Sequence, residues 1–232
     1  MGANNYFSKL VLFVMVFFSA KSINCQRLTT IKNTCGLYYR SMAGLKKDQG
    51  TALQFYRFNP GDTIASIGAQ ACNWEAAYAA VSDSVFFYLE DIDTVYCNAR
   101  QAALAWQYYN TLKDNDITGG HTIVIGDEKS THLPTRSCDK ILIINSFHEF
   151  TYPEEMLHDI ARKLKPNGIL YIDETMALYP GELHVNCNKP LLTEDKLVKF
   201  AESNGFKYIN SVTVVWHKKK PARKIFAFEV KG

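Results

Sequence analysis

The sequence predicts an α/β fold: a mostly parallel seven-stranded sheet with helices on both faces and an antiparallel hairpin at its C-terminal end. Two observations support this prediction. Short, β-rich apolar runs alternate with longer segments of helical periodicity, which is typical of a parallel sheet wrapped by helices. The last two strand-like runs follow one another with only a short connection, which favours an antiparallel pair.

Seven runs have the length and the composition of strands. Several of them are almost continuously hydrophobic, so we expect burial on both faces of the sheet. A turn at Asn59–Gly61 precedes the first run, and a polar turn at Asn115–Gly120 precedes the third. The predicted strands are Thr63–Ile67, Val85–Leu89, His121–Ile125, Lys140–Ile144, Ile169–Ile172, Phe206–Trp216 and Lys224–Val230.

The first predicted helices lie before and between the early strands. The spacing of apolar residues over Leu37–Tyr56 predicts one or two helices before the first strand. Asn73 is suited to cap a helix over Trp74–Val81, because its side chain can accept from the first free backbone amides. A longer helical segment covers Thr94–Leu112. Trp74 and Trp106 fall at helical positions and are expected in the core.

Two later helices have clear ends. Pro153 suits the first position of a helix that runs to Leu164, and Lys165–Gly168 forms a stop signal. The final helix starts at Thr193 and ends near Asn204 and Gly205. The helix that begins at Pro153 has one apolar face. That face contains Met156, Leu157, Ile160, Ala161 and Leu164.

Composition indicates one globular domain. The chain has 232 residues, of which 47% are hydrophobic and 21% charged, and its formal net charge is only +3. This length suits a single core, and we assign residues 26–232 to it because no repeat or low-complexity linker appears. The small net charge gives no reason to expect nucleic-acid binding, which favours a strongly basic face.

The first 25 residues have the pattern of an export signal. Lys9 precedes the apolar run Leu10–Phe18, and small residues follow, with Ala20 and Ser22 spaced for cleavage after Ser22. The run is shorter than the roughly 20 apolar residues of a membrane-spanning helix. We therefore expect an exported protein, periplasmic, extracellular or lipid-anchored through Cys25. The alternative is an uncleaved N-terminal segment that anchors the protein to a membrane.

The six cysteines show no zinc-binding signature. They stand at positions 25, 35, 72, 97, 138 and 187, so no two are separated by only two residues. Cys72 and Cys97 are expected to be buried free thiols. We expect no metal site on this basis, although scattered Asp and His residues could still assemble one.

The loops that follow the strands contain the candidate ligand-binding residues. In an open α/β sheet, ligands bind outside the carboxyl ends of the strands. Gly68 follows the first strand, and a glycine there lets the backbone approach a ligand closely. Glu90 and Asp91 follow the second strand, where a carboxylate can accept from two ribose hydroxyls. Asp127 follows the third strand, and the segment 145–150 follows the fourth.

The order of these elements from about Asn59 to Val230 resembles the class I S-adenosylmethionine-dependent methyltransferase family. Ile125-Gly126-Asp127, Leu133-Pro134 and Asp139 resemble the adenine side of that family's site. The helix that leads into Leu164-Lys165-Pro166-Asn167-Gly168 resembles the family's helix, Leu-Lys-Pro-Gly-Gly and strand. The C-terminal hairpin resembles the family's antiparallel seventh strand.

The resemblance implies S-adenosylmethionine as the cofactor and assigns its contacts. Gly68 would face the methionine part, and Asp91 would hold the ribose, with Glu90 as the alternative. Asp127 would reach the adenine, and Asn145 would line the floor of the cleft. The implied cofactor-binding set also includes Ala69 and Glu128.

The first loop departs from the family pattern at three positions. Where the family has an acid and two further glycines, this chain has Ser66, Gln70 and Cys72. Side chains at Gln70 and Cys72 could crowd the cofactor or replace backbone contacts. Two interpretations therefore stay open, retained cofactor binding or a fold that has lost it.

Two segments are expected near the methyl acceptor: the loop after the fourth strand and the insert after the fifth. His148 is a candidate general base, because a near-neutral pKa lets it accept a proton from a hydroxyl or amine. The alternative is a structural role in the wall of the cleft. Methyl transfer needs mainly positioning, so a missing base would not exclude activity. The segment Thr175–Leu192 is a long insert whose place suggests a lid or an acceptor-site wall.

These observations predict an S-adenosylmethionine-dependent methyl transfer to a small-molecule acceptor. The alternative is an exported binding module that keeps the fold without the cofactor. A nicotinamide dehydrogenase is disfavoured, because the first loop lacks the three-glycine fingerprint. A basic cluster around Lys218–Lys220 could touch an anionic surface, although such runs are more often solvated hairpin ends.

Overall fold

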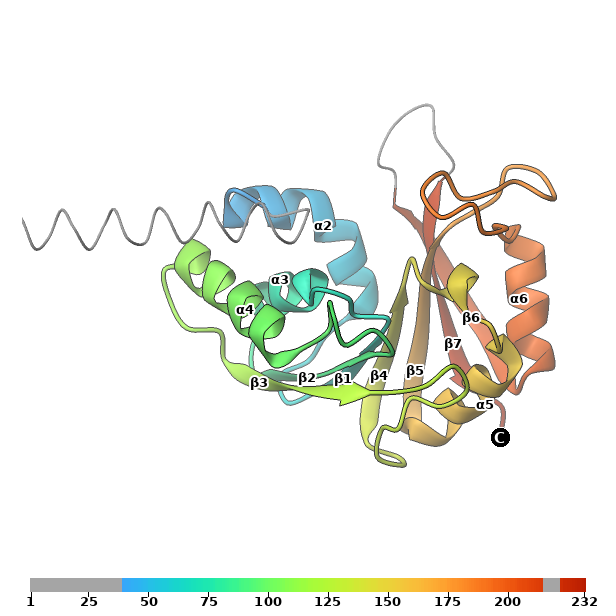
Figure 1. The fold of residues 1–232 in the computed structure, drawn as a ribbon, viewed down its shortest axis with the longest axis horizontal. Helices are drawn as coiled ribbons and strands as arrows, with labels where there is room; N and C mark the ends of the chain where they lie inside the picture. The colour runs from blue at the N-terminus through green and yellow to red at the C-terminus, as the bar shows by residue number, and fades with distance from the viewer. Residues whose placement is uncertain (1–38, 215–221) are drawn as a thin grey trace, which may run out of the picture. The chain divides into compact units, whose positions relative to one another are not determined.

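The computed structural model describes residues 39–214 and 222–232, which contain a seven-stranded sheet in the order β3-β2-β1-β4-β5-β7-β6 (Figure 1). The five strands β1 to β5 pair in parallel, while β7 runs antiparallel to both β5 and β6. The predicted fold class is therefore confirmed. The strands are β1 Thr63–Ile67, β2 Val85–Asp91, β3 Gly119–Ile125, β4 Cys138–Ile144, β5 Leu164–Thr175, β6 Phe206–Val214 and β7 Arg223–Val230.

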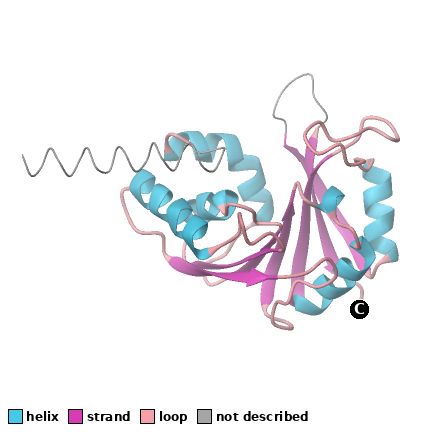
Figure 2. Cartoon of the chain, in the orientation of Figure 1, coloured by secondary structure: helices cyan, strands magenta, loops and turns pink. Residues whose placement is uncertain are grey.

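Helices cover both faces of this sheet (Figure 2). Helices α2, α3 and α4 are grouped together on one side, and α5 and α6 lie on the other (Figure 1). Within the described residues, no helix is long and apolar enough to cross a membrane. The helices are α2 Met42–Tyr56, α3 Asn73–Val81, α4 Ala99–Lys113, α5 Pro153–Lys163 and α6 Glu194–Ser203, with a 3₁₀ turn η1 at Phe147–Glu149.

Some predicted features lie outside the described residues. They are the export segment 1–25, the first residues of the predicted helix from Leu37, and the basic cluster Lys218–Lys220.

The order of the strands fixes where a ligand can bind. The chain adds β2 and β3 on one side of β1, and then returns to add β4 and β5 on the other side. In such a sheet the loops after β1 and β4 diverge to opposite faces and leave a crevice at the carboxyl ends. The candidate site is therefore expected at the carboxyl ends of β1, β2 and β4.

The core confirms most of the predicted burial. On α5, Met156, Leu157 and Ile160 are buried against the sheet, while Ala161 is only partly buried. Trp106 is buried as expected. Trp74 differs from the prediction because it is only partly buried, and the Arg223 guanidinium lies 5.1 Å from the centre of its ring. The face of an indole ring attracts such a cation, so a partly exposed position suits this tryptophan.

Two helix starts differ from the sequence prediction. Asn73 is not a cap but the first residue of α3, and Cys72 occupies the cap position with φ of 59° and without a capping hydrogen bond from its side chain. Helix α4 begins at Ala99 rather than at Thr94, with Asn98 as the cap. The cause lies in Asp93, whose carboxylate and carbonyl accept from the amides of residues 95 and 97 and hold that segment in a turn.

Strand β5 is longer than predicted. The segment Lys165–Gly168 ends α5 as expected, but it already pairs irregularly with β4, so β5 starts at Leu164. Near its carboxyl end Asp173 is fully buried and accepts two hydrogen bonds from Arg223, at 2.6 and 2.5 Å. The hydroxyl of Tyr56 donates a third, at 2.6 Å. A buried carboxylate needs such partners to offset its desolvation, and these bonds join β5 to β7 and α2.

Candidate functional site

A cavity of about 320 Å³ opens at the carboxyl ends of the parallel strands. This volume lies within the range of small-molecule sites, roughly 300–1,000 Å³. Its walls come from the loops after β1, β2, β3 and β4 and from α5. The lining residues are Ile67, Gly68, Gln70, Glu90, Asp91, Ile92, Asp93, Tyr96, Asp127, Glu128, Ser146, Glu149, Phe150, Thr151 and Met156.

Most of the predicted site residues lie in this lining. They are Gly68, Glu90, Asp91, Asp127 and Glu128. Three other predicted residues, Ala69, Asn145 and His148, are described by the structure but do not line the cavity.

The altered first loop keeps the backbone conformation that glycines would take. Gly68 has φ of 76°, and a Cβ at this position would lie 2.8 Å from the Ser146 side chain. Gln70 and Cys72, which stand where the family has glycines, have φ of 44° and 59°. These left-handed conformations are uncommon for residues with a side chain. Cys72 is buried away from the cavity, so only Gln70 of these two reaches the lining.

Asp91 supports the first loop as well as lining the cavity. Its Oδ2 accepts from the amide of Gln70 at 2.8 Å, and its Oδ1 accepts from the amide of Asp93 at 2.8 Å. Both oxygens are therefore engaged by backbone. Each retains a further lone pair for a ligand, since an ionised carboxylate offers about four acceptor sites.

Glu90, unlike Asp91, has a side-chain oxygen without a partner in the described part of the chain. Among the described residues, its Oε1 has no hydrogen-bond partner although the residue is 1% exposed. Burial, followed by the charge of Asp91, raises the pKa of Glu90 to about 9. The carboxyl group is therefore neutral near pH 7 and can both donate and accept. Buried polar atoms without partners are rare, so this one points to a missing ligand.

The loop after β3 makes room for Glu90. A Cβ at Gly126 would lie 2.0 Å from Glu90 Oε1 and 2.8 Å from the carbonyl oxygen of Ser130. Any residue other than glycine would therefore displace the Glu90 side chain or the loop. The glycine in Ile125-Gly126-Asp127 is explained by this contact.

Asp127 is already bound within its own loop. Its Oδ1 accepts from the amides of Lys129 and Ser130 at 2.8 and 2.9 Å, and its Oδ2 lies 3.0 Å from His132 Nε2. The bond from the Lys129 amide is the largest of the effects that lower its pKa, so it stays ionised. Glu128 accepts from the Thr151 hydroxyl at 3.1 Å and links the loops after β3 and β4.

The mouth of the cavity has an apolar side. Ile92 and Tyr96 line it and are 56% and 55% exposed. Phe150 and Met156 add apolar surface from the β4 side. A flat aromatic group could therefore pack at this mouth, while polar groups of the same ligand reach Glu90 and Asp91.

The comparison with known proteins agrees with this geometry. The sequence profile of the family described as a methyltransferase domain matches residues 87–172, which span β2 to most of β5. Residues 87–172 thus match a methyltransferase domain, and the described residues have the class I methyltransferase-like fold. No curated protein sequence matches the chain.

Solved structures share the methyltransferase fold at low sequence identity. An S-adenosylmethionine-dependent methyltransferase from Aquifex aeolicus has a TM-score of 0.57 and 19% identity, covering 81% of this chain and 98% of its own. One from Methanosarcina mazei has a TM-score of 0.61 and 16% identity, with coverages of 78% and 98%. The 1,6-didemethyltoxoflavin-N1-methyltransferase of Burkholderia thailandensis has a TM-score of 0.60 and 14% identity, with coverages of 100% and 92%.

The Burkholderia structure contains bound S-adenosylhomocysteine, and the resemblance implies S-adenosylmethionine as the cofactor here. Two observations indicate that the residues present fit it. The unpartnered Oε1 of Glu90 offers a buried partner to a ribose hydroxyl, and the missing side chain at Gly68 leaves a space that a Cβ would fill. Asp91 and Glu90, the two acids that the sequence offered for the ribose, both line the cavity.

His148 lies behind the wall of the methyltransferase cavity. Its side chain is only 2% exposed, and its Nδ1 is 2.9 Å from Glu174 Oε2. Burial lowers its pKa, but the hydrogen bond and charge of Glu174 outweigh this and raise it overall. The neighbouring Glu149 lines the cavity instead. This arrangement favours the structural alternative for His148 over the general base.

Asn145 is also turned away from the cavity. Its φ is 52°, and its Oδ1 accepts from the Thr175 hydroxyl at the end of β5, at 3.1 Å. Ala69 is buried, and its amide donates to the carbonyl oxygen of Glu90. Both residues therefore shape the loops of the site through backbone and side-chain contacts outside the lining.

Several lining residues were not singled out from the sequence. They are Tyr96, Thr151 and Met156. All but Met156 stand within eight positions of a predicted strand end. The same rule that selected Gly68 and Asp91 could have found them, but residue type alone does not say which side chains of a loop turn inward.

Proposed function

We propose that this protein transfers the methyl group of S-adenosylmethionine to a small-molecule acceptor. The observation that supports this most is the open cavity, in which the buried Glu90 Oε1 has no partner among the described residues. The cofactor supplies a methyl group on a sulfonium, which is already a good electrophile. The chain has then to hold the two reactants in line, and positioning alone can supply a large part of the rate.

The proposed roles follow the walls of the cavity. Glu90 and Asp91 would bind the two ribose hydroxyls, since one is a neutral carboxylic acid and the other has lone pairs to spare. Gly68 would let the backbone approach the methionine part. Ile92 and Tyr96 would pack against the adenine at the mouth.

The acceptor would enter from the β4 side. Ser146, Glu149 and Phe150 form that wall, and they combine a hydroxyl, a carboxylate and an aromatic ring. The cavity volume suits a small molecule rather than a large surface. The similar Burkholderia enzyme binds 1,6-didemethyltoxoflavin, a small methyl acceptor. The fold itself is compatible with many different acceptors.

The alternative function, a binding module without cofactor, predicts a filled cavity. Such a module could fill it with Gln70, Cys72 or Trp74, but neither Cys72 nor Trp74 belongs to its lining. Gln70 alone reaches it, and its amide is fixed by Asp91. We therefore favour the enzyme over the binding module.

Calorimetric titration of S-adenosylhomocysteine and S-adenosylmethionine into the purified chain tests the proposal. We expect micromolar binding, and a loss of about tenfold or more in Glu90→Ala, which removes the buried hydrogen-bonding group. Asp83→Ala, an exposed change outside the cavity lining, serves as the control and should bind like the parent chain. Absence of heat at millimolar ligand from folded protein would overturn cofactor binding and leave the binding module.

We also propose, on the pattern of residues 1–25 alone, that the domain is exported or held at a membrane. Fractionation of cells that express the full chain, compared with a version lacking residues 1–25, tests this. The full chain should leave the cytoplasmic fraction and the shortened one should stay in it. Equal distribution of the two would contradict the proposal.

A further inference from the structure

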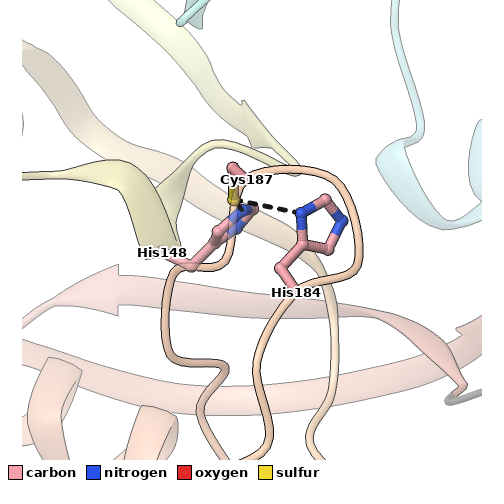
Figure 3. A group of neighbouring side chains, drawn as sticks. All are labelled: His148, His184 and Cys187. Carbon is pink, nitrogen blue, oxygen red and sulfur yellow. Dashed lines mark hydrogen bonds between the residues drawn. The ribbon is translucent and has the colours of Figure 1, made fainter.

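Three side chains with metal-binding atoms meet beside the cavity wall. His148, His184 and Cys187 form a group that we call the His–Cys cluster (Figure 3). Cys187 Sγ is 3.4 Å from His148 Nε2 and 3.2 Å from His184 Nδ1. All three ligand atoms lie within 4.8 Å of one another. Sequence spacing did not reveal this group, because His148 is far from the other two in the chain.

The cluster joins the core to the insert. His148 belongs to η1, which follows β4, whereas His184 and Cys187 belong to the segment 176–192 between β5 and α6. Apart from these residues, the insert is open to solvent in several places. Leu178 is 70% exposed and Val185 is 86% exposed. An additional tie between insert and core at the cluster would therefore hold the insert in place.

The spacing of the three atoms suits one tetrahedral metal ion. Zinc binds sulfur at about 2.3 Å and histidine nitrogen at about 2.0–2.1 Å, so a nitrogen and a sulfur on one ion stand about 3.5 Å apart. The two observed nitrogen–sulfur distances are close to this value. A thiolate with two imidazoles is also the ligand set that thiophilic transition metals prefer.

The surroundings of His148 prepare it as a ligand. Glu174, 2% exposed, accepts from the amide of Phe147 through Oε1 and lies 2.9 Å from His148 Nδ1 through Oε2. An ionised carboxylate only accepts, so the proton of a neutral His148 sits on Nδ1. The lone pair of Nε2 then faces Cys187. Such a carboxylate behind a histidine is the usual outer partner of a metal ligand.

We propose that the His–Cys cluster binds a divalent transition metal of the zinc class through His148 Nε2, His184 Nδ1 and Cys187 Sγ. Binding releases the thiol proton of Cys187 to solvent. The fourth position is left for solvent or for Glu149, whose Oε1 is 3.8 Å from His148 Nε2. The metal pins the insert against the loop whose Glu149 lines the cavity. The inference rests on the cluster alone and does not depend on cofactor binding.

Cobalt titration of the metal-free, reduced full chain tests the proposal. Co²⁺ reports thiolate ligation by a charge-transfer absorption band and tetrahedral geometry by its visible bands. We expect both in the parent chain, and displacement of Co²⁺ by Zn²⁺. Cys187→Ser should lose the charge-transfer band, and His184→Ala should bind Co²⁺ more weakly. His158→Ala, which removes an exposed histidine on α5, is the matched control and should behave like the parent.

Two further measurements separate a metal site from a set of hydrogen bonds. Glu174→Gln should weaken Zn²⁺ binding by about 10–100-fold, because the amide no longer favours the required tautomer of His148. Zn²⁺ should slow proteolysis within 176–192 in the parent chain but not in Cys187→Ser. A charge-transfer band that survives in Cys187→Ser would place the metal elsewhere, and a folded parent chain without a band at millimolar Co²⁺ has no such site. Either result would overturn the proposal.

Discussion

Ser66 donates a 2.5 Å hydrogen bond to Glu75 Oε1, so a carboxyl group from α3 reaches the strand position where the family has an acid. Glu75 is 2% exposed, and among the described residues its Oε2 has no hydrogen-bond partner. The acid missing at position 66 is thus replaced by one from the following helix. Burial raises the pKa of Glu75 to about 7.

Glu75→Gln should make stability less dependent on pH. The folded pKa lies above the unfolded value of 4.5, so the folded state binds more protons, and stability falls as pH rises from about 4.5 to about 7. The glutamine removes this loss while it can still accept from Ser66. Relative to the parent chain, the variant should gain about 3 kcal/mol between pH 4.5 and pH 8. Urea unfolding of both proteins across this range measures the gain.

Asp83→Asn, an exposed carboxylate change, is the control for this experiment and should follow the parent at every pH. A difference between Glu75→Gln and the parent that stays constant from pH 4.5 to pH 8 would show that Glu75 does not titrate in the native state as stated.

Gly126→Ala should weaken cofactor binding by displacing Glu90. The added Cβ would lie 2.0 Å from Glu90 Oε1, so the carboxyl group has to leave its present position. We expect a fall of about tenfold in affinity for S-adenosylhomocysteine, equal to the loss of one buried hydrogen bond. Gly50→Ala, a helical position with no atom within 4 Å, is the control, and calorimetry should find its affinity unchanged.

Gly119→Ala should destabilise the β3 edge of the sheet. Gly119 has φ of 94°, and a Cβ there would lie 2.0 Å from the carbonyl oxygen of Val85 in β2. The strain and the clash together should cost about 2 kcal/mol or more in the free energy of unfolding. At the adjacent Gly120 the nearest atoms, in the Phe86 ring, are 3.4 Å away, so Gly120→Ala should cost much less. Equal effects of the two substitutions in denaturant unfolding would contradict this account.

Asp173→Asn should destabilise the protein strongly because it leaves the Arg223 charge without its carboxylate. The two side chains are 1% and 11% exposed. Breaking a buried pair by removing one partner costs about 3–5 kcal/mol in the free energy of unfolding. Glu229→Gln breaks the exposed pair with Lys207 and should cost less than about 1 kcal/mol. Chemical denaturation of both variants compares a buried with an exposed ion pair in one sheet.

The sequence was sufficient for the elements with clear ends. Pro153 and the stop signal after Leu164 bracket α5 because proline fixes the first turn and glycine cannot extend it cheaply. Sequence analysis placed the start of α4 too early, because the five residues after Asp93 have the spacing of a helix. In the structure the Asp93 carboxylate accepts from the amide of Val95, and its backbone carbonyl accepts from the amide of Cys97. Local side-chain hydrogen bonds of this kind compete with helix formation and leave no periodic signal.

The candidate site was predictable in its loops but not in its side-chain directions. Gly68 follows the end of β1, Glu90 and Asp91 are the last two residues of β2, and all three line the cavity. Asn145 and His148 also follow a strand end, yet Thr175 and Glu174 at the end of β5 hold them away from the lining. The His–Cys cluster lay beyond sequence analysis altogether, because it depends on how the insert folds back toward η1.

The side chains of the last three residues of β5 each contact a residue from a different part of the chain. Asp173 accepts a hydrogen bond from Arg223 of β7, Glu174 pairs with His148 of η1, and Thr175 donates to Asn145 in the loop after β4. The end of one strand therefore fixes the position of three other elements. Successive side chains in a strand face opposite sides of the sheet. Deletion of one residue before Asp173 would therefore move all three side chains to the other face and break all three contacts. These three contacts therefore require the exact length of β5 and place no such demand on the segment that follows it.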